Sequence, residues 1–208
     1  MQIEAIKSGR QKIFKELYKF TDFYLVGGTA LALQIGHRVS VDFDLFYPKD
    51  LPKNLTEKVR RIFLGSKFKI FIRHAEQLSV YVDNVKIDFV RYAFPLILKP
   101  VIFERVPMAQ VLEIAAMKAY TLSFRGTFKD YVDLYFILKE GFATLKEIED
   151  LADKKYGGDF NFRLFLEQLV YLSDITEEQQ KNVEFLREKI DKKGLCKFFQ
   201  EEVKKVKI

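Results

Sequence analysis

The chain has 208 residues, of which 49% are hydrophobic and 31% are charged, so a disordered or fibrous protein is excluded and a substantial core can form. The single cysteine, Cys196, excludes an internal disulfide and is typical of a reducing compartment. No run approaches the roughly 18 apolar residues of a membrane span, and residues 2–20 do not resemble a signal peptide. We therefore expect a cytoplasmic protein without membrane contact.

The net charge of +6 is unevenly distributed along the chain. Residues 1–105 contain 18 basic and 11 acidic side chains, whereas residues 106–208 contain 17 and 18. A basic first half suits a polyanionic partner such as a nucleotide or RNA. Charge alone does not require such a partner, because solvated lysines that keep a small protein soluble are the simpler explanation.

The first half of the chain mixes helical and strand patterns. Helical spacing of apolar residues predicts helices over 2–20, 29–35 and 56–65. Short apolar runs and strict alternation predict strands at 23–26, 41–46, 68–72, 78–82 and 85–92. Asp83-Asn84 is expected to form a tight turn between the last two strands.

The second half is predicted to be helical. Pro95, Pro100 and Pro107 mark a connection, and the helices that follow are expected at about 109–124, 128–140, 144–156, 160–172, 176–190 and 194–206. Thr127 and Asp130 have the spacing of a cap at the start of the second of these. The fold class is therefore α+β: a mixed β-sheet with flanking helices in a domain over residues 1–105, and an α-helical C-terminal domain over residues 106–208.

Paired carboxylates are the clearest chemical signal. Asp42 and Asp44 lie two residues apart on a predicted strand, so their side chains share a face and their Cα atoms are about 6.5–7 Å apart. Such a pair repels unless a cation lies between the carboxylates, and Mg²⁺ prefers oxygen ligands of this kind. Asp88 lies on another alternating strand. If the two strands are neighbours, Asp88 completes the metal site and serves as a general base.

A glycine pair precedes these acids. Gly27 and Gly28 stand between an apolar strand and a helix, where the backbone can approach a phosphate and the helix N-terminus can bind it. Taken separately, the acids fit a strand with a solvated face and the glycines fit an ordinary turn. The ordered combination favours a site for transferring a phosphate-containing group.

The motifs that contain the glycine pair and the acids resemble those of a known family. Gly-Gly-Thr-Ala-Leu-Ala-Leu at 27–33 and Gly-His-Arg-Val-Ser-Val-Asp-Phe-Asp-Leu-Phe at 36–46 resemble the AbiEii/AbiGii-type abortive-infection toxins, nucleotidyltransferases of the DNA polymerase β-like superfamily. Lys-Ile-Asp-Phe at 86–89, Glu-Ile-Ala-Ala-Met-Lys-Ala at 113–119 and the run at 125–134 are similar to later motifs. The resemblance covers residues 22 to 140 and implies a nucleotidyltransferase-type sheet.

The resemblance implies roles for individual residues. Catalytic roles would fall to Asp42, Asp44, Asp88 and Lys118, with Mg²⁺, or Mn²⁺ in its place, held by the three aspartates. By the same resemblance, nucleotide binding would involve Gly27, Gly28, Thr29, Lys118, Asp130 and Asp133. The residues themselves add two candidates: Arg38, whose guanidinium suits a triphosphate, and Ser40, which shares the face of the acid pair. Alternatives remain for several of these: Arg38 could instead pair with Asp42 or Asp44, and Asp130 and Asp133 suit a helix start for dipole reasons alone.

The implied activity is Mg²⁺-dependent transfer of a nucleoside monophosphate from a nucleoside triphosphate to an acceptor hydroxyl. The family further implies a toxin of a toxin–antitoxin or phage-defence pair, with tRNA as acceptor and a cognate antitoxin as partner. Transfer to a small molecule, transfer of AMP to a protein, and a nucleotide- or RNA-binding module without turnover are the alternatives. His37 and His74 lack the spacing of metal ligands and are expected to be structural.

Overall fold

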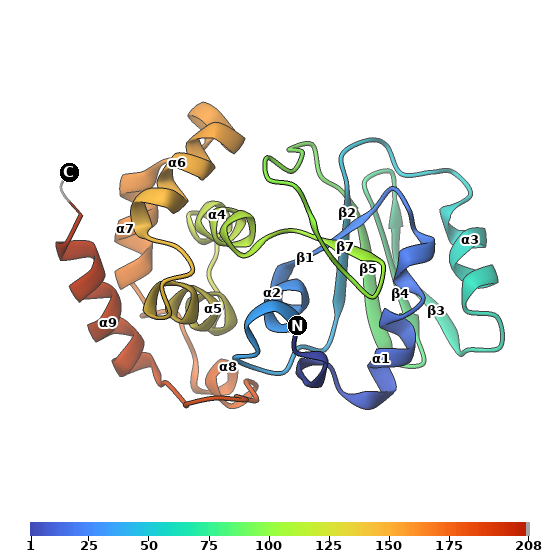
Figure 1. Cartoon of the computed structure of the whole chain (residues 1–208), viewed down its shortest axis with the longest axis horizontal. Helices are drawn as coiled ribbons and strands as arrows, with labels where there is room; N and C mark the ends of the chain where they lie inside the picture. Colours follow the sequence, from blue (N-terminus) through green and yellow to red (C-terminus); the bar gives the residue numbers. More distant parts are fainter. Residues whose placement is uncertain (207–208) are drawn as a thin grey trace.

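The computed structural model describes residues 1–206 and places a mixed β-sheet beside a group of helices (Figure 1). The strands form one sheet in the order β3-β4-β5-β2-β1-β7-β6. Their bounds are β1 Tyr24–Val26, β2 Phe43–Tyr47, β3 Phe68–His74, β4 Gln77–Val82, β5 Val85–Arg91, β6 Val101–Phe103 and β7 Val106–Met108. The sheet lies at one end of the molecule and the later helices lie at the other (Figure 1).

The helices fall into two groups along the chain. Those of the first half are α1 Ser8–Phe14, α2 Gly27–Ile35 and α3 Leu55–Ile62. Those of the second half are α4 Val111–Leu122, α5 Phe128–Lys139, α6 Leu145–Tyr156, α7 Phe162–Val170, α8 Glu177–Lys181 and α9 Lys192–Lys204. Within residues 1–206, no helix has the length and apolar character needed to cross a membrane.

Strand β2 lies at the centre of the sheet and fixes the position of the acids. It pairs antiparallel with β1, where Val26 lies opposite Asp44. On its other side it pairs parallel with β5, where Asp44 lies opposite Asp88. Since β1 ends at Val26, the turn that begins α2 must start directly beside Asp44.

One face of the sheet is covered by the N-terminal segment and α3. The rings of Phe14 and Phe43 are stacked with centroids 6.2 Å apart, and Phe20 meets Phe89 edge to face at 4.8 Å. Each fully buried phenylalanine stabilises the fold by about 1.5–3 kcal/mol. Because Phe43 and Phe89 alternate with the acids along their strands, this packing directs Asp44 and Asp88 to the opposite face.

The prediction of one helix over residues 2–20 is wrong. The segment contains a 3-10 turn at Ile3–Ala5, then α1, then a second 3-10 turn at Leu17–Lys19. The break has a tertiary cause: Ile6 forms a parallel β-bridge with Ser40, and the Ser40 N–H donates to the carbonyl of Ala5 at 2.9 Å. These long-range hydrogen bonds replace the helical ones that the local pattern favoured.

The predicted helix over 176–190 is also shorter than expected, because α8 ends at Lys181. Residues 184–186 instead run beside residues 37–39. The Val39 N–H donates to the Glu184 carbonyl at 2.8 Å, and the Leu186 N–H donates to the His37 carbonyl at 3.0 Å. Segment 37–40 is therefore held between an early and a late part of the chain.

Two short strands, β6 and β7, were missed because each has three residues and the second contains Pro107. Their connection contains no glycine, yet Glu104 and Arg105 adopt φ values of 48° and 69°. Asp83 and Asn84 likewise have positive φ in the turn between β4 and β5, which confirms that predicted turn. The α+β class is confirmed, with the sheet ending at Met108, while the division into two domains near residue 105 stays a prediction.

Candidate active site

Three carboxylates gather on the face of the sheet that the aromatic core leaves uncovered. Asp44 and Asp88 are direct neighbours across β2 and β5, and Asp42 lies just before β2 at the exposed edge of the group. Burial, reinforced by the negative charges of Asp88 and Asp42, raises the pKa of Asp44 to about 6. Burial also raises the pKa of Asp42, although Lys86 and Lys129 oppose the shift. The carboxylates therefore carry an unfavourable concentration of negative charge.

Lys86 is the cation nearest to this group. It lies two residues before Asp88 on β5, and its Nζ donates to Asp88 Oδ2 at 2.6 Å. The other oxygen of Asp88, Oδ1, is buried and has no hydrogen-bond partner. Burial alone would lower the pKa of Lys86, but Asp88, Asp44 and Asp42 together raise it. Lys86 thus offsets part of the repulsion among the acids.

The glycine turn is shaped by what lies against it. Gly27 has φ +68°, a conformation that residues with a side chain rarely adopt, and a Cβ added there would lie 2.7 Å from Asp44 Oδ2. A Cβ on Gly28 would collide with the guanidinium Nη2 of Arg38. Both glycines are therefore required by close approach to charged side chains.

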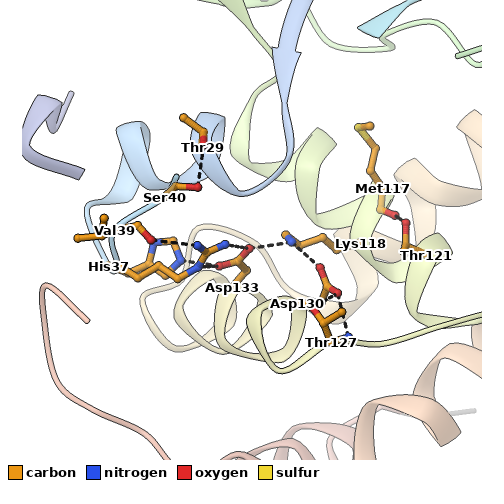
Figure 2. A network of polar contacts seen from close by, with 11 residues as sticks. Thr29, His37, Val39, Ser40, Met117, Lys118, Thr121, Thr127, Asp130 and Asp133 are labelled. Atoms are coloured by element: carbon orange, nitrogen blue, oxygen red, sulfur yellow. Dashed lines mark hydrogen bonds and ion pairs between the residues drawn. The ribbon is translucent and has the colours of Figure 1, made fainter. Parts of the chain in front are cut away.

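Thr29 and Ser40 join α2 to the segment that leads into β2. The Thr29 Oγ1 lies 2.7 Å from Ser40 Oγ (Figure 2). It also hydrogen-bonds the carbonyl oxygen of Asp42. Both side chains are buried. The contacts fix the backbone of Asp42 relative to the start of α2, which is where the sequence analysis placed the phosphate-binding turn.

A second group of charges surrounds Asp133 of α5 in the interior (Figure 2). Arg38 Nε and Nη2 donate to the two carboxylate oxygens of Asp133 at 2.7 and 2.9 Å. His37 Nε2 lies 2.7 Å from Asp133 Oδ1, and Lys118 Nζ lies 2.7 Å from Oδ2. Lys118 also donates to Asp130 Oδ1 at 2.8 Å. We call these five residues the Asp133 cluster.

The charges in the Asp133 cluster stabilise one another. Burial alone would raise the pKa of Asp133, but Arg38 and Lys118 hold it well below its usual range. Burial likewise opposes the charged form of Lys118, yet Asp130 and Asp133 raise its pKa. His37 differs, because burial lowers its pKa and leaves it neutral at pH 7. Lys118 is close enough to Asp44 to lower the pKa of that carboxyl, so the cluster adjoins the acids.

Most of the predicted site residues therefore lie in one region, but their partners differ from those expected. Arg38 pairs with Asp133, which contradicts the alternative of an ion pair with Asp42 or Asp44. His37 is structural in the sense predicted, since it is fully buried against Asp133. In the part of the chain that the structure describes, no three His, Cys, Asp or Glu side chains are grouped closely enough to hold a metal ion as they stand. Metal binding by Asp42, Asp44 and Asp88 stays a prediction.

Sequence reasoning missed two contributors. Alternation along residues 85–92 placed Lys86 on the same face as Asp88, so the signal was present, but nothing local showed that the lysine would contact the acid. Thr127 was assigned only as a helix cap. Its N–H and hydroxyl both donate to Asp130 Oδ2, at 3.0 and 2.7 Å, and so orient the carboxylate that contacts Lys118.

Several solved structures share the fold of this chain. MenT4, a nucleotidyltransferase toxin from Mycobacterium tuberculosis, aligns over 95% of this chain and 83% of its own with a TM-score of 0.63 at 15% identity. The antibiotic-resistance factor ANT(2'')-Ia aligns over 71% and 90% with a TM-score of 0.51 at 16% identity. JHP933 from Helicobacter pylori aligns over 95% and 93% with a TM-score of 0.52 at 16% identity. The fold is that of the nucleotidyltransferases.

Sequence comparison then identifies the family. The uncharacterized protein aq_aa25 of Aquifex aeolicus is 34% identical over 188 residues, which are 88% of this chain and 87% of that protein. Residues 14–201 match the family described as "Nucleotidyl transferase AbiEii toxin, Type IV TA system". The chain therefore belongs to the AbiEii family and is a nucleotidyltransferase, which confirms the resemblance found in the sequence.

Proposed function

We propose that this enzyme transfers a nucleoside monophosphate from a nucleoside triphosphate to a hydroxyl of tRNA, with Mg²⁺ or Mn²⁺ as cofactor. The observation that carries the proposal is the meeting of Asp44 and Asp88 with the glycine turn of α2 on one face of the sheet. In a metal–triphosphate complex, carboxylates can bind the metal and a helix N-terminus can bind the phosphates.

The acids fit a divalent cation. Asp42, Asp44 and Asp88 would be its ligands. The Oδ1 of Asp88 is buried without a hydrogen-bond partner, and it is a carboxylate oxygen of the kind that Mg²⁺ prefers as a ligand. Burial and the negative charges of Asp88 and Asp42 raise the pKa of Asp44, and a bound cation would offset both effects. When bound, the cation would stabilise negative charge on the transferring phosphoryl group.

The phosphates of the nucleotide would lie at the start of α2. No side chain caps this helix, so the N–H groups of its first turn are available to an anion, and the helix dipole favours negative charge there. In this proposal Lys118, whose charge lowers the pKa of Asp44, would exchange its contacts with Asp130 and Asp133 for the same phosphates. Arg38 already contacts Asp133 through two nitrogens, so in this proposal it mainly positions segment 37–40, together with Asp133.

The reaction is an in-line displacement at the α-phosphorus. The acceptor hydroxyl gives its proton to Asp88 and forms the new P–O bond, while the bond to the β-phosphate oxygen breaks and pyrophosphate leaves. Membership of a toxin family and the basic first half of the chain support tRNA as acceptor and a cognate antitoxin as partner. On the same basis we propose a role in toxin–antitoxin control or phage defence.

One experiment tests this function and its alternatives. Purified protein is incubated with Mg²⁺, total tRNA and each labelled nucleoside triphosphate in turn. Label in RNA supports the proposal, whereas label in the protein or in an added aminoglycoside supports another acceptor class. Replacing Asp42 by asparagine should lower the rate of labelling by at least about a hundredfold. The variant should still fold, because the side chain of Asp42 is exposed. Parent-level labelling by this variant would refute the metal assignment.

A further inference from the structure

The face of the sheet that carries the acids continues beyond them toward the edge strand. In register, Lys86 of β5 lies opposite Tyr81 of β4, and Tyr81 lies opposite Lys69 of β3. Paired residues on neighbouring strands have side chains on the same face, so these three side chains share the face of Asp88. Strand spacing places Tyr81 and Lys69 about 8–12 Å from Asp88.

Phe71 of β3 adds a second aromatic ring to this face, because it lies two residues from Lys69 on the same strand. The pairing of β3 with β4 shifts between Ile70 and Ile72, which makes Phe71 the extra residue. Phe71 is 58% exposed, and its ring meets that of Tyr81 edge to face with centroids 5.9 Å apart. Phe71 therefore has no role in the core and presents an apolar ring to solvent beside the tyrosine.

The two rings lie in a hollow with basic walls. A surface pocket of about 410 Å³ is lined by Lys67, Phe68, Lys69, Phe71, Tyr81 and Asn84. Neither Lys67 nor Lys69 belongs to any ion pair found among residues 1–206, whereas many other surface lysines, such as Lys146, do. Asp83, next to the pocket, accepts a hydrogen bond from the Lys67 backbone N–H at 2.9 Å, and this bond, with a smaller contribution from the charge of Lys67, lowers the pKa of its carboxyl.

We propose that this pocket binds a single-stranded segment of the RNA acceptor, with bases stacked on Phe71 and Tyr81 and phosphates beside Lys67 and Lys69. The inference rests on the proposed function, because it assigns the substrate class of the same site. Flat rings between unpaired lysines are the groups that bind single strands without reading sequence. A duplex would not fit this chemistry, since its bases are already stacked on one another. The RNA then continues past Tyr81 and Lys86, so that its reactive hydroxyl lies at Asp88.

The test measures RNA binding separately from catalysis. A short fluorescently labelled single-stranded RNA is titrated with parent protein, Phe71→Ala/Tyr81→Ala, and Lys67→Gln/Lys69→Gln, and binding is followed by fluorescence anisotropy at several salt concentrations. Removing the rings should weaken binding about tenfold or more. Removing the lysines should reduce the slope of log K against log salt by about 1.4, because each phosphate contact on a single strand contributes about 0.7.

Matched controls come from the other end of the molecule. Phe142→Ala removes a phenylalanine that is 44% exposed, and Lys193→Gln/Lys197→Gln removes two exposed charges from α9. Both should bind RNA like the parent. Melting curves show whether the pocket variants are folded, and the lysine pair keeps the inference testable if the ring variants are not.

Different results identify which idea fails. Pocket variants that bind RNA as tightly as the parent, with the parent salt slope, overturn the pocket assignment, and so does a parent that binds no RNA. If the parent binds RNA through the pocket but transfers no label from any nucleoside triphosphate, the pocket stands and the proposed function fails.

Discussion

Replacing Asp133 by asparagine removes a buried negative charge that Arg38, Lys118 and His37 all contact. Taking away one partner of a buried ion pair usually costs about 3–5 kcal/mol, because the remaining charge stays buried without compensation. Native proteins are stable by about 5–15 kcal/mol, so the loss is a large fraction of the total. For a chain of this size it corresponds to a fall in melting temperature of about 6–20 °C.

The dependence of this loss on pH follows from the depressed pKa of Asp133. A carboxyl whose pKa is lower in the folded state stabilises the fold above its unfolded pKa, near 3.9, and loses that contribution as pH falls through the folded value. Asparagine does not titrate. The difference in unfolding free energy between parent and variant should therefore be constant from about pH 5 to 8 and shrink in stronger acid.

Urea denaturation at several pH values measures this difference. Asp130→Asn is the matched control, because Asp130 contacts Lys118 but is 19% exposed and leaves Arg38 paired; it should cost only about 1–2 kcal/mol. If Asp133→Asn lies within about 1 kcal/mol of the parent at pH 7, or costs no more than the control, the Asp133 cluster does not contribute to stability as we argue.

Three further predictions concern the acids and the glycine turn. In urea denaturation, Gly27→Ala should lose about 1–2 kcal/mol of unfolding free energy because of its positive φ, and more because of the clash with Asp44; nucleotidyl transfer should fall at least tenfold. Gly141→Ala is the control, since Gly141 has φ +70° but open space around it. This variant should lose only about 1–2 kcal/mol, the part that comes from the positive φ, and should keep full activity. Asp44→Asn should stabilise the metal-free protein by up to about 3 kcal/mol at pH 8, because a carboxyl whose pKa is raised in the folded state destabilises the fold at pH values above that pKa. The gain should vanish below about pH 4. Melting curves that show no gain at pH 8 would contradict the burial of this charge. Lys86→Gln removes the cation that pairs with Asp88, so the variant should bind Mn²⁺ more tightly than the parent in a titration followed by electron paramagnetic resonance. Unchanged or weaker Mn²⁺ binding would show that the lysine does not compete with the cation.

The parts of the site that depend on strand alternation were predictable from the sequence. The period of two placed Asp42 with Asp44 and set Asp88 on a second strand, and the apolar residues between them showed which side faces the core. The glycine pair also indicated a close approach. What approaches it, the carboxylate of Asp44 and the guanidinium of Arg38, depends on the packing of α2 and was visible only in the structure.

The Asp133 cluster could not have been derived from local patterns. Arg38 and Asp133 are 95 residues apart, and no local pattern connects the two side chains. Asp133 is the sixth residue of α5, beyond the first turn where the helix dipole favours an acid, so the structure also removes that alternative for Asp133. The same kind of long-range contact caused the two errors in helix length. Residues 5–6 and 184–186 have helical spacing, but their backbone groups bond to segment 37–40, and tertiary hydrogen bonds outweigh local preference.

This arrangement of segment 37–40 has a consequence for the synthesis of a toxic enzyme. A growing polypeptide that has emerged only as far as the acids lacks both the carboxylate that neutralises Arg38 and the segment 184–186 that lies beside Val39. Both arrive late, the second only when residue 186 has left the ribosome. Incomplete translation products are therefore expected to be inactive, because the proposed catalytic centre is completed only on a nearly finished chain.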